Sequence, residues 1–387
     1  QLSNGSGLNV PQPKKTRCTS LAPSIKTNPT LEPSSRLIKG RSMNSGFTCK
    51  VAINHALLII LCTVAFVSAS RKVDADGITS LTNKTISYER IEGHYVKLKR
   101  GDISVIVADN SAIDIPELPN HRAGYNGIAS LKHTHQNKNV FVPSIAGLNF
   151  EHIHDGSKSG LIEKFEPRKF PMQIRRIDEH TVELYQPPTG NWKLESCGRY
   201  SLLADGTIEY AFECIPRAND FSKGYIGLFW ASYIDQPNDK AIHFKGRRKN
   251  TDDSTRWIKA TTPSHGVEST HQPSGTTKTI DVDADFPLTL VGNLSKHEYV
   301  DSWYYGLSHT MALAFMFRPR DEIWFAQSPS GGGNGNPAWD FQWFIRDVQV
   351  GKSYGFTMRA AYVPFEGRSS LERSTRSHRT ALRDQDR

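Results

Sequence analysis

The sequence predicts an all-β protein, a large antiparallel β-sandwich of two sheets, and three observations lead to this prediction. Short runs rich in aromatic and β-branched residues recur through the body of the chain, and Gly, Pro, Asn or Asp bound most of them, as strands joined by turns require. No stretch of about 12 or more residues repeats apolar residues at the helical period between recognisable caps. Runs of strands without intervening helices favour antiparallel sheets packed in two layers.

The predicted strands follow one another between residues 94 and 365. They are HYVKLKR, DISVIVAD, NVFVPSI, TVELYQP, YIGLFWASYI, AIHFKG, TKTIDVDADF, LTLVG, MALAFMF, EIWFAQS, FQWFIRDV and SYGFTMRAAYVPF. No internal repeat of about 20–50 residues accompanies them, which argues against a propeller. Residues 77–367 are therefore predicted to form a single β-sandwich domain.

One predicted hairpin carries both cysteines of this domain. ESCGRYSLLADGTIEYAFECIP, residues 195–216, has two apolar runs on either side of Asp205-Gly206, the strongest short turn signal. A two-residue turn there places Cys197 directly opposite Cys214, in a non-hydrogen-bonded pair whose Cα separation suits a disulfide. The sequence therefore predicts a Cys197–Cys214 disulfide, and two half-buried thiols in register are the alternative.

The two ends of the chain are predicted to lie outside the folded domain. Residues 43–69 have an apolar core and small or β-branched residues at 67 and 69, which is typical of a signal peptide cleaved after Ala69. An uncleaved anchor is the alternative. Residues 1–42 are interpreted as a non-native or disordered extension, and the Arg/Ser-rich residues 368–387 as a disordered basic tail. We therefore expect an exported protein, periplasmic or extracellular, with no stable membrane span after cleavage.

The net charge of +9 is concentrated at these ends. Residues 1–70 carry +7, residues 71–76 cancel and residues 368–387 carry +3, which leaves −1 for the body. A nucleic-acid-binding surface would need its basic residues on the folded body. The charge distribution therefore indicates no nucleic-acid partner.

Several segments resemble a family of uncharacterised exported bacterial proteins. They are HRAGYNGIASL, FVPSIAGLNFEHIHDG, GRYSLLADGTIEYAFECIPR, FWASYI and AQSPSGGGNGNPAWDFQWFI, and the resemblance covers most of residues 88–367. The 195–216 hairpin followed by GLFWASYI is also similar in layout to the middle of galactose-mutarotase-like domains. This second resemblance implies a β-supersandwich with a concave sheet face that binds a carbohydrate, and it does not choose between catalysis and binding.

Two polar segments supply the candidate acid–base residues. GLNFEHIHDG provides Glu151 and His152, and TTPSHGVESTHQPSG provides His265 and Glu268. A carboxylate and an imidazole near a sugar ring can open the ring or remove its C5 proton. In a regular strand Glu151 and His152 would point to opposite faces. Polar loop ends and a solvated connection are the alternatives.

A third segment, ELPNHRAGYNGIASL, supplies candidate binding residues before a predicted strand. It presents His121, Arg122, Tyr125 and Asn126. A cation, an imidazole and an amide in one loop can hold a hydroxyl-rich ligand, and Arg122 could hold a carboxylate. An ordinary turn is the alternative, because Asn-His and Asn-Gly are turn formers.

Aromatic and amide side chains complete the candidate binding residues. They are Tyr233, Tyr304, Gln327 and Trp339. Aromatic rings can stack on the apolar faces of sugars. The run DSWYYG, residues 301–306, cannot bury all three rings on one face of a strand, so at least one is expected to be exposed or to line a cleft. Trp339 follows a glycine-rich loop that is predicted to form a rim or lid after Gln327. Burial in the core is the alternative.

No metal and no cofactor is predicted. His133 and His135 repeat the His-x-His spacing of His152 and His154, and each pair could supply half of a metal site, but nothing in the sequence brings the pairs together. The run DVDAD lacks the Gly and Glu of a calcium-binding loop. The chain also has no nucleophile-elbow, dinucleotide or zinc-protease motif.

The sequence therefore predicts an exported protein with a carbohydrate ligand. The expected chemistry is acid–base catalysis on a sugar, like that of an epimerase, mutarotase or lyase. The alternative is a non-catalytic glycan-binding or cell-envelope structural protein. The oligomeric state is left open.

Overall fold

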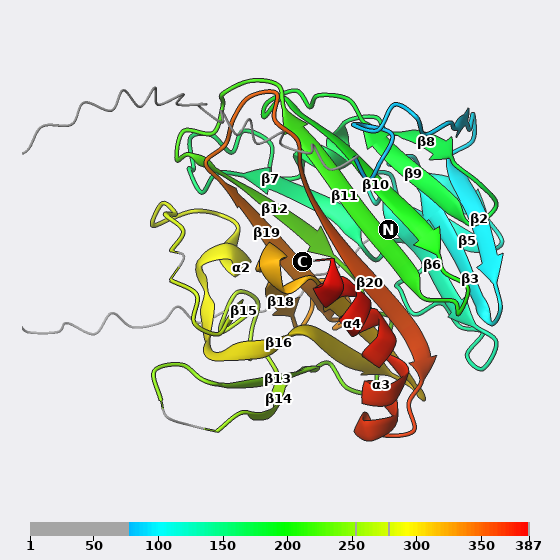
Figure 1. Ribbon diagram of the computed structural model, residues 1–387, viewed down its shortest axis with the longest axis vertical. Coiled ribbons are helices and arrows are strands. Elements are labelled where there is room, and N and C mark those ends of the chain that lie inside the picture. Colours follow the sequence, from blue (N-terminus) through cyan, green and yellow to red (C-terminus); the bar gives the residue numbers. More distant parts are fainter. Residues whose placement is uncertain (1–76, 252–253, 278, 386–387) are drawn as a thin grey trace, which may run out of the picture. The chain divides into compact units, whose positions relative to one another are not determined.

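The computed structural model of the chain describes residues 77–251, 254–277 and 279–385. The predicted extension, residues 1–42, and the predicted signal peptide, residues 43–69, lie outside the described residues. Strands dominate the described residues (Figure 1), so the predicted all-β class is confirmed. Within these ranges, no helix is long and apolar enough to cross a membrane.

The described residues form twenty strands and five short helical segments. The strands are β1 (Glu89–Arg90), β2 (Tyr95–Arg100), β3 (Ile103–Ala108), β4 (Ile113–Ile115), β5 (Leu118–His121), β6 (Gly127–His133), β7 (Asn149–His154), β8 (Gln173–Arg176), β9 (Thr181–Gln186), β10 (Leu194–Leu202), β11 (Ile208–Pro216), β12 (Tyr225–Ala231), β13 (Ile242–Arg248), β14 (Arg256–Ala260), β15 (Thr270–Pro273), β16 (Leu294–Ser308), β17 (Met311–Phe317), β18 (Trp324–Ser328), β19 (Ala338–Arg346) and β20 (Tyr354–Pro364). The helices are α1 (Glu166–Lys169), α2 (Thr289–Gly292), the 3-10 helix η1 (Pro319–Asp321), α3 (Arg368–Ser374) and α4 (Arg376–Asp384).

One sheet of 15 strands makes up most of the domain. Its main path runs β1-β8-β9-β10-β11-β20-β17-β16-β15-β18-β19-β12-β7, and β13 and β14 branch from β16. The pairing of β15 with β16 is parallel, and the other pairings of this sheet are antiparallel. Two small sheets, β2-β3-β6 and β4-β5, complete the strand pairing.

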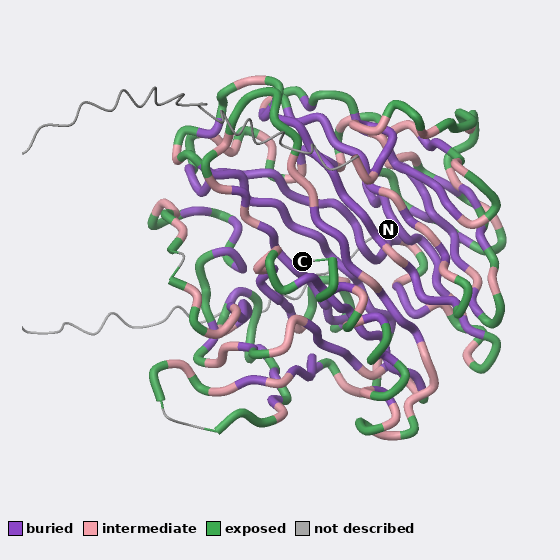
Figure 2. The backbone as a smooth tube through the Cα atoms, viewed as in Figure 1, coloured by how far each residue is buried: buried purple, intermediate pink, exposed green. Residues whose placement is uncertain are grey.

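The long sheet folds over so that its two halves pack face to face. The ring of Phe150 in β7 lies 5.2 Å from that of Phe212 in β11, and Trp230 in β12 lies 5.0 Å from Phe356 in β20. These pairs belong to one large apolar cluster between the two layers, where Figure 2 shows the strands as buried. The predicted two-layer packing is confirmed, although one continuous hydrogen-bonded sheet supplies both layers.

The 195–216 hairpin forms, but its register is one residue away from the prediction. Cys197 pairs with Glu213, and Cys214 pairs with Ser196. The chain turns through a loop of three residues in which Gly206 has a φ of 85°, as in a type I turn closed by a glycine bulge. A shift of one residue turns a side chain to the other face of a strand. Cys197 and Cys214 are therefore separate buried thiols, and the predicted disulfide is wrong.

Residues 368–385 form α3 and α4 and a short end, and the prediction of a disordered tail was wrong for them. Leu371 and Leu382 pack with Trp303 and Tyr305 in a second apolar cluster. The helices lie over one face of the sheet near β16, β17 and β20 (Figure 1). All three rings of the run DSWYYG are buried, so the expectation that one of them would be exposed was also wrong.

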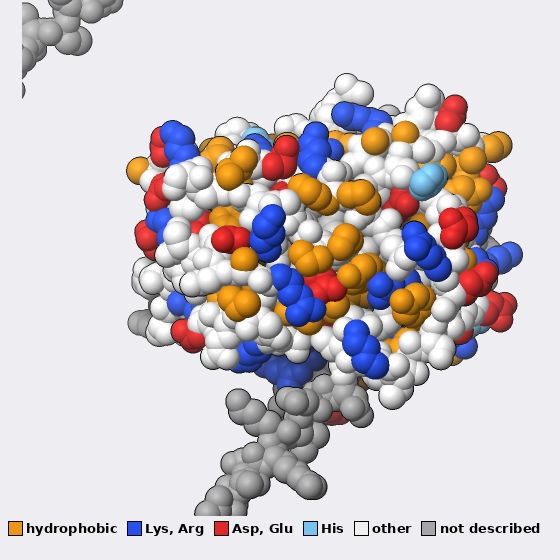
Figure 3. Space-filling view, turned by 90° about the horizontal axis from the view of Figure 1, so that it is seen from above, with side chains coloured by type: hydrophobic (Ala, Val, Ile, Leu, Met, Phe, Trp, Pro, Cys, Tyr) orange, Lys and Arg blue, Asp and Glu red, His pale blue; other side chains and the backbone are white. Residues whose placement is uncertain are grey.

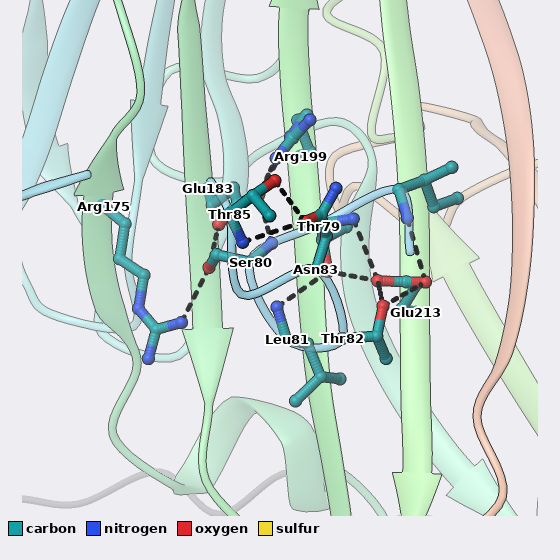
Figure 4. Close-up of polar contacts among 11 residues, drawn as sticks. Thr79, Ser80, Leu81, Thr82, Asn83, Thr85, Arg175, Glu183, Arg199 and Glu213 are labelled. Atoms are coloured by element: carbon teal, nitrogen blue, oxygen red, sulfur yellow. Dashed lines mark hydrogen bonds and ion pairs between the residues drawn. The ribbon is translucent and has the colours of Figure 1, made fainter. Parts of the chain in front are cut away.

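The first described residues are fixed to the face of β9, β10 and β11 by two buried glutamates (Figure 4). Glu213 accepts hydrogen bonds from the backbone N–H of Thr79 at 2.9 Å and from its hydroxyl at 2.6 Å. Glu183 accepts one from the backbone N–H of Ser80 at 2.9 Å and forms an ion pair with Arg199 at 2.6 Å. Both buried carboxylates are thus satisfied by partners, and this segment is part of the folded domain.

Acidic and basic side chains are mixed on the surface of the domain. Figure 3 shows one face, on which both kinds alternate with hydrophobic side chains and neither forms a continuous field. Exposed ion pairs such as Lys97–Glu117, at 2.6 Å, contribute to this pattern. Such pairs stabilise a fold little, and the mixed surface agrees with the near-zero charge of residues 77–367.

Candidate functional site

A β-bulge in β7 turns two of the predicted residues to the same side of the sheet. His152 pairs with Phe229 of β12, and the next residue of β12, Trp230, pairs with Phe150. Glu151 is therefore the extra residue of the bulge. Glu151 and His152 both line a cavity, whereas Phe150 enters the core. The prediction that strand alternation would separate Glu151 from His152 was wrong, because the bulge interrupts the alternation.

The face of β7, β12 and β19 that points away from the main core forms the floor of this cavity, which measures about 240 Å³. The structure brings five of the predicted residues to it: Tyr125, Glu151, His152, Tyr233 and His265. The lining also includes Lys164, Phe165, Arg168, Phe229, Ser328, Asp340 and the segment 287–291. Side chains from loops far apart in the sequence thus converge on one depression.

Glu151 is the centre of a hydrogen-bonded group at the floor. Its Oε1 lies 3.2 Å from Nε2 of His152, and its Oε2 accepts hydrogen bonds from the Tyr233 hydroxyl and from Nδ2 of Asn149 at 2.8 Å. Nδ1 of His152 donates to the backbone carbonyl of Lys164 at 2.5 Å. Both ring nitrogens of His152 therefore face oxygen atoms that can accept hydrogen bonds.

Two carboxyl groups in the cavity have pKa shifts of opposite sign. Burial alone would raise the pKa of Glu151, but the hydrogen bond and charge of His152, helped by Arg168 and Tyr233, outweigh burial and lower it. Burial raises the pKa of Asp340 well above its usual value; the N–H of Ser232 opposes the shift, and the charge of Glu151 adds to it. The pKa values of the two carboxyl groups are thus shifted in opposite directions, as in an acid–base pair.

Arg168 supplies a cation at the edge of the cavity. Its Nε donates to the carbonyl of Gly124 at 2.9 Å, and its guanidinium lies 3.8 Å from the ring centre of Tyr125. Its Nη1 is 4.0 Å from Oε2 of Glu151. Gly124 has a φ of 89°, a conformation that favours glycine. The guanidinium therefore has a fixed position and keeps donors free for a ligand.

His265 and Lys164 also contribute to the charge of the lining. Burial lowers the pKa of His265, the charge of Lys164 lowers it further, and Glu151 opposes this shift. His265 is consequently neutral near pH 7. Lys164 forms no ion pair with any described residue, and its Nζ lies 5.6 Å from the ring centre of Phe165.

Three predicted residues of the 117–131 segment lie behind or beside the cavity. Nε2 of His121 is hydrogen-bonded to the carbonyl of Tyr125 at 2.9 Å. Asn126 bonds to the backbone of Phe150 through both ends of its amide. Arg122 is exposed, with its guanidinium 5.3 Å from the ring centre of Tyr125. None of the three lines the cavity.

Four other predicted residues lie away from the cavity. Glu268 forms a half-exposed ion pair with Lys296 at 3.3 Å. Tyr304 and Trp339 are buried in the main core, and the buried Gln327 contacts the ring of His271 at 3.2 Å. Trp339 points inward because it alternates with Asp340, which takes the outward position of β19.

The predicted His-x-His patterns do not meet in one site. His152 lines the cavity, whereas His154 is buried beside Phe286 and burial lowers its pKa to about 3. His133 and His135 are adjacent to each other near Tyr362. Among the described residues, no three His, Cys, Asp or Glu side chains are placed to hold a metal ion.

The sequence contained a signal for one of the residues that its analysis missed. Asp340 directly follows the apolar Trp339 in a strand, so alternation would have assigned it to the opposite face. Arg168 and Lys164 had no such signal. They belong to a segment of loop and short helix, residues 161–172, that has no strand period and reaches the site only through tertiary packing.

No protein-family model and no curated protein sequence matches the chain. Among solved structures, it is similar to a protein described as an aldose 1-epimerase from Escherichia coli K12, with a TM-score of 0.39 and 8% identity over 70% of this chain and 99% of that one. A heparinase III matches with a TM-score of 0.38 and 6% identity over 72% of this chain. A heparan sulfate lyase from Pedobacter heparinus matches with a TM-score of 0.37 and 8% identity over 71%. The chain spans 36% of each of the last two proteins. At these TM-scores and identities, the likeness carries no argument about function.

Proposed function

We propose that this protein is an acid–base enzyme that acts on a sugar bound in the cavity. Glu151 is the general base, and Asp340 is the general acid. His152 and Tyr233 are positioning residues that hold the Glu151 carboxylate and keep it ionised. Tyr125, Tyr233 and Phe229 provide the aromatic surface that sugar rings pack against.

The observation that supports this proposal most strongly is that one small cavity is lined by two carboxyl groups whose pKa values are shifted in opposite directions. Different surroundings shift their pKa values in opposite directions, since Glu151 has His152, Arg168 and Tyr233 as partners, whereas the Asp340 carboxyl group accepts, among the described residues, only the backbone N–H of Ser232 at 3.0 Å. Enzymes that transfer protons at neutral pH separate the pKa values of paired carboxyl groups in this way.

The two groups can perform one balanced proton transfer. Glu151 accepts a proton from a hydroxyl or carbon of the sugar, the electrons left behind form a C=O or C=C bond, and a neighbouring C–O bond breaks. Asp340 gives its proton to the departing oxygen. Loss of a hydroxyl proton opens the ring, as an epimerase requires, whereas loss of the C5 proton eliminates the substituent, as a lyase requires. Proton exchange with water restores both carboxyl groups.

The test combines two product assays with two isosteric variants. Ring opening is followed by optical rotation of freshly dissolved aldoses, and elimination by the ultraviolet absorbance of the new C=C bond in uronic-acid polymers. In Glu151→Gln and Asp340→Asn, the turnover number should fall by about 10²–10⁴-fold, while the affinity for the sugar stays within a few-fold of the parent value.

The same experiment separates the enzyme from its alternative. A non-catalytic glycan-binding protein would bind the sugar without turning it over, and Phe229→Ala would weaken that binding. Turnover that survives in both carboxyl variants would refute the assignment of Glu151 and Asp340. Glu268→Gln is the matched control, because Glu268 lies outside the cavity and should not affect turnover.

Export of this enzyme is a further part of the proposal, supported by the signal-like sequence of residues 43–69. Fractionation of cells that express the full chain tests it. Recovery outside the cytoplasm, with a new N-terminus after Ala69, is the expected result. An unprocessed cytoplasmic chain would contradict it.

A further inference from the structure

A second cavity, of about 480 Å³, lies beside the first and shares one wall with it. Arg168 lines both cavities. The second lining is completed by His94, Asp109, Asn110, Ser111, Ala123, Gly124, Lys169, Phe170, Pro171 and Met172. The proposed chemistry uses none of these other residues.

Two chain segments pass between the cavities and make the shared wall. Tyr125 lines the first cavity, and the preceding residues Ala123 and Gly124 line the second. In the same way, Phe165 lines the first cavity and Lys169 the second, with Arg168 between them. The bond from Arg168 to the carbonyl of Gly124 ties the two segments together. The two cavities thus lie on opposite sides of a single ridge, which is formed by residues 123–125 and 165–169.

Three positive groups with free donors lie along this ridge, and Glu151, at 4.0 Å from Nη1 of Arg168, is the one acidic partner among the described residues. Lys164 and Lys169 are both exposed, and neither forms an ion pair with a described residue. The Nη2 group of Arg168 makes no hydrogen bond within the described residues. Asp109, the acid in the second lining, is already engaged by Nδ1 of His94 at 3.1 Å and by the N–H of Ser111 at 2.8 Å. An anionic group that lies across the ridge would therefore meet free donors.

We propose that the two cavities are adjacent subsites for an acidic oligosaccharide whose carboxylate or sulfate binds Arg168. This inference rests on the proposed function, because the first cavity is the subsite in which proton transfer takes place. One sugar ring occupies that subsite, and the next ring of the chain crosses the ridge into the second cavity, beside Lys169.

The sizes of the two cavities support an oligomer rather than a free monosaccharide. The first cavity, at about 240 Å³, is smaller than the roughly 300–1,000 Å³ that is usual for drug-sized ligands. It has room for one ring among its aromatic side chains. The second cavity, at about 480 Å³, adds the space and the polar lining for further rings.

Affinity as a function of oligomer length tests the inference. Isothermal titration calorimetry on the full chain would use galacturonate, mannuronate and sulfated galactose oligomers of one, two and four residues, with neutral galactose oligomers of the same lengths. The acidic tetrasaccharide that fits should bind at least about tenfold more tightly than its monosaccharide. The neutral series should show a smaller gain.

Variants of the second cavity should remove this gain and leave the first subsite intact. Ala123→Trp fills the second cavity with a ring, and the tetrasaccharide should then bind no better than the monosaccharide. Lys169→Glu should weaken tetrasaccharide binding by about three- to tenfold at low salt. Lys99→Glu is the matched control, because Lys99 is exposed and lines neither cavity. Circular dichroism and the thermal midpoint confirm that each variant is folded.

The outcomes distinguish this inference from the proposed function. If the protein turns over a monosaccharide but its affinity does not depend on oligosaccharide length, the proposal of two adjacent subsites is refuted and the proposed enzymatic function stands. An equal length gain for the neutral series refutes the acidic ligand. A folded Ala123→Trp variant that keeps the full gain refutes the second cavity as a subsite. Failure of every sugar to bind, monomer or oligomer, refutes both proposals.

Discussion

At the residue scale, Asp340 illustrates how a proposed catalytic group can lower the stability of the fold. Its pKa is raised well above the usual value, chiefly by burial. The unfolded chain releases this proton above a pH of about 4, whereas the folded chain keeps it. Folding therefore takes up a proton, and the free energy of unfolding falls as the pH rises from about 4 towards the folded pKa, by about 1.4 kcal/mol per pH unit.

We expect Asp340→Asn to remove this pH dependence and to stabilise the protein at neutral pH. The amide is neutral in both states, so its folding takes up no proton, and the gain should grow by about 1.4 kcal/mol for each pH unit above about 4 until the folded pKa is reached. Denaturant unfolding measured between about pH 4 and pH 8, from the ordinary Asp pKa to about 4 units above it, checks the prediction.

A second buried carboxyl group provides the control for this prediction. The pKa of Asp321 is also raised, chiefly by burial, but Arg318 forms an ion pair with it at 2.7 Å. Removing one partner of a buried pair leaves the other charge unpaired. Asp321→Asn should therefore destabilise the protein. If Asp340→Asn destabilises it as well, Asp340 is not held protonated in the folded state.

The Tyr233 hydroxyl should tune the pH at which the proposed base works. Its hydrogen bond to Glu151 contributes to the lowered pKa of that carboxyl. Tyr233→Phe removes the bond, so the pKa of Glu151 should rise. The base must be ionised, and activity falls below its pKa. The acidic limb of the kcat/KM profile should therefore move to higher pH.

Tyr225→Phe is the matched control for this shift. The Tyr225 hydroxyl donates to the backbone carbonyl of Asp281 at 2.8 Å and has no contact with Glu151. Its profile should keep the parent acidic limb. An unchanged limb in Tyr233→Phe as well would contradict the assignment of Glu151 as the base.

Residue types and strand alternation could predict part of the site, and tertiary packing decided the rest. Glu151, His152 and His265 were found because imidazole and carboxylate recur in polar segments. Glu268, in the same loop as His265, instead faces Lys296, and sequence carries no information on which side of a loop faces a cavity. The bulge at Glu151 could not be predicted either, because it depends on the partner strand.

At the element scale, the register of the 195–216 hairpin could have been predicted from its pattern of apolar residues. Tyr200 and Leu202 of β10 and Tyr210 and Phe212 of β11 all enter the main core. In both strands the even-numbered residues face the core. Directly paired residues lie on the same face of a sheet, so the residue numbers of each pair must add up to an even number, as those of Tyr200 and Tyr210 do. The two-residue turn predicted an odd sum. Burial of one face fixes register more strongly than turn preference does.

The two C-terminal helices were missed because half of their buried stripe is polar. The buried residues are Leu371, Thr375, His378 and Leu382, a spacing of four, three and four that fits one helix face. His378 is satisfied by Asp205 at 2.7 Å and by the hydroxyl of Thr207 at 3.1 Å. Only Leu371 and Leu382 are apolar, so a hydrophobicity pattern detects only two of these four buried positions.

Removing the contact of α4 with the sheet should destabilise the domain. Leu382 is buried against the cluster that contains Trp303 and Tyr305. Leu382→Ala should lower the free energy of unfolding by about 2–4 kcal/mol, and Trp fluorescence followed during denaturant unfolding measures it. Arg376→Ala, at an exposed position of the same helix, should change stability little. Equal small effects of both variants would show that α4 does not pack on the sheet in solution.

At the scale of the whole molecule, β20 is an inner strand of one layer of the sandwich, and its face packs against β12 of the other layer. It pairs with β11 on one side and with β17 on the other. Ile208 and Ala360 are direct partners although about 150 residues separate them in the sequence. Alternating apolar runs predicted the layers, but they could not predict this order, because local patterns do not determine which distant strands pair.

The central place of β20 predicts a difference between two truncations. A chain that ends at residue 367 lacks α3 and α4 but keeps β20, so it should still unfold in one cooperative transition, at a lower denaturant midpoint. A chain that ends at residue 350 lacks β20 and leaves β11 and β17 as unpaired edges over an exposed core. It should show no cooperative transition and should aggregate. Near-ultraviolet circular dichroism during denaturant unfolding of both chains tests this. A cooperative transition of the chain ending at residue 350 would mean that the sandwich folds without the strand that connects β11 to β17.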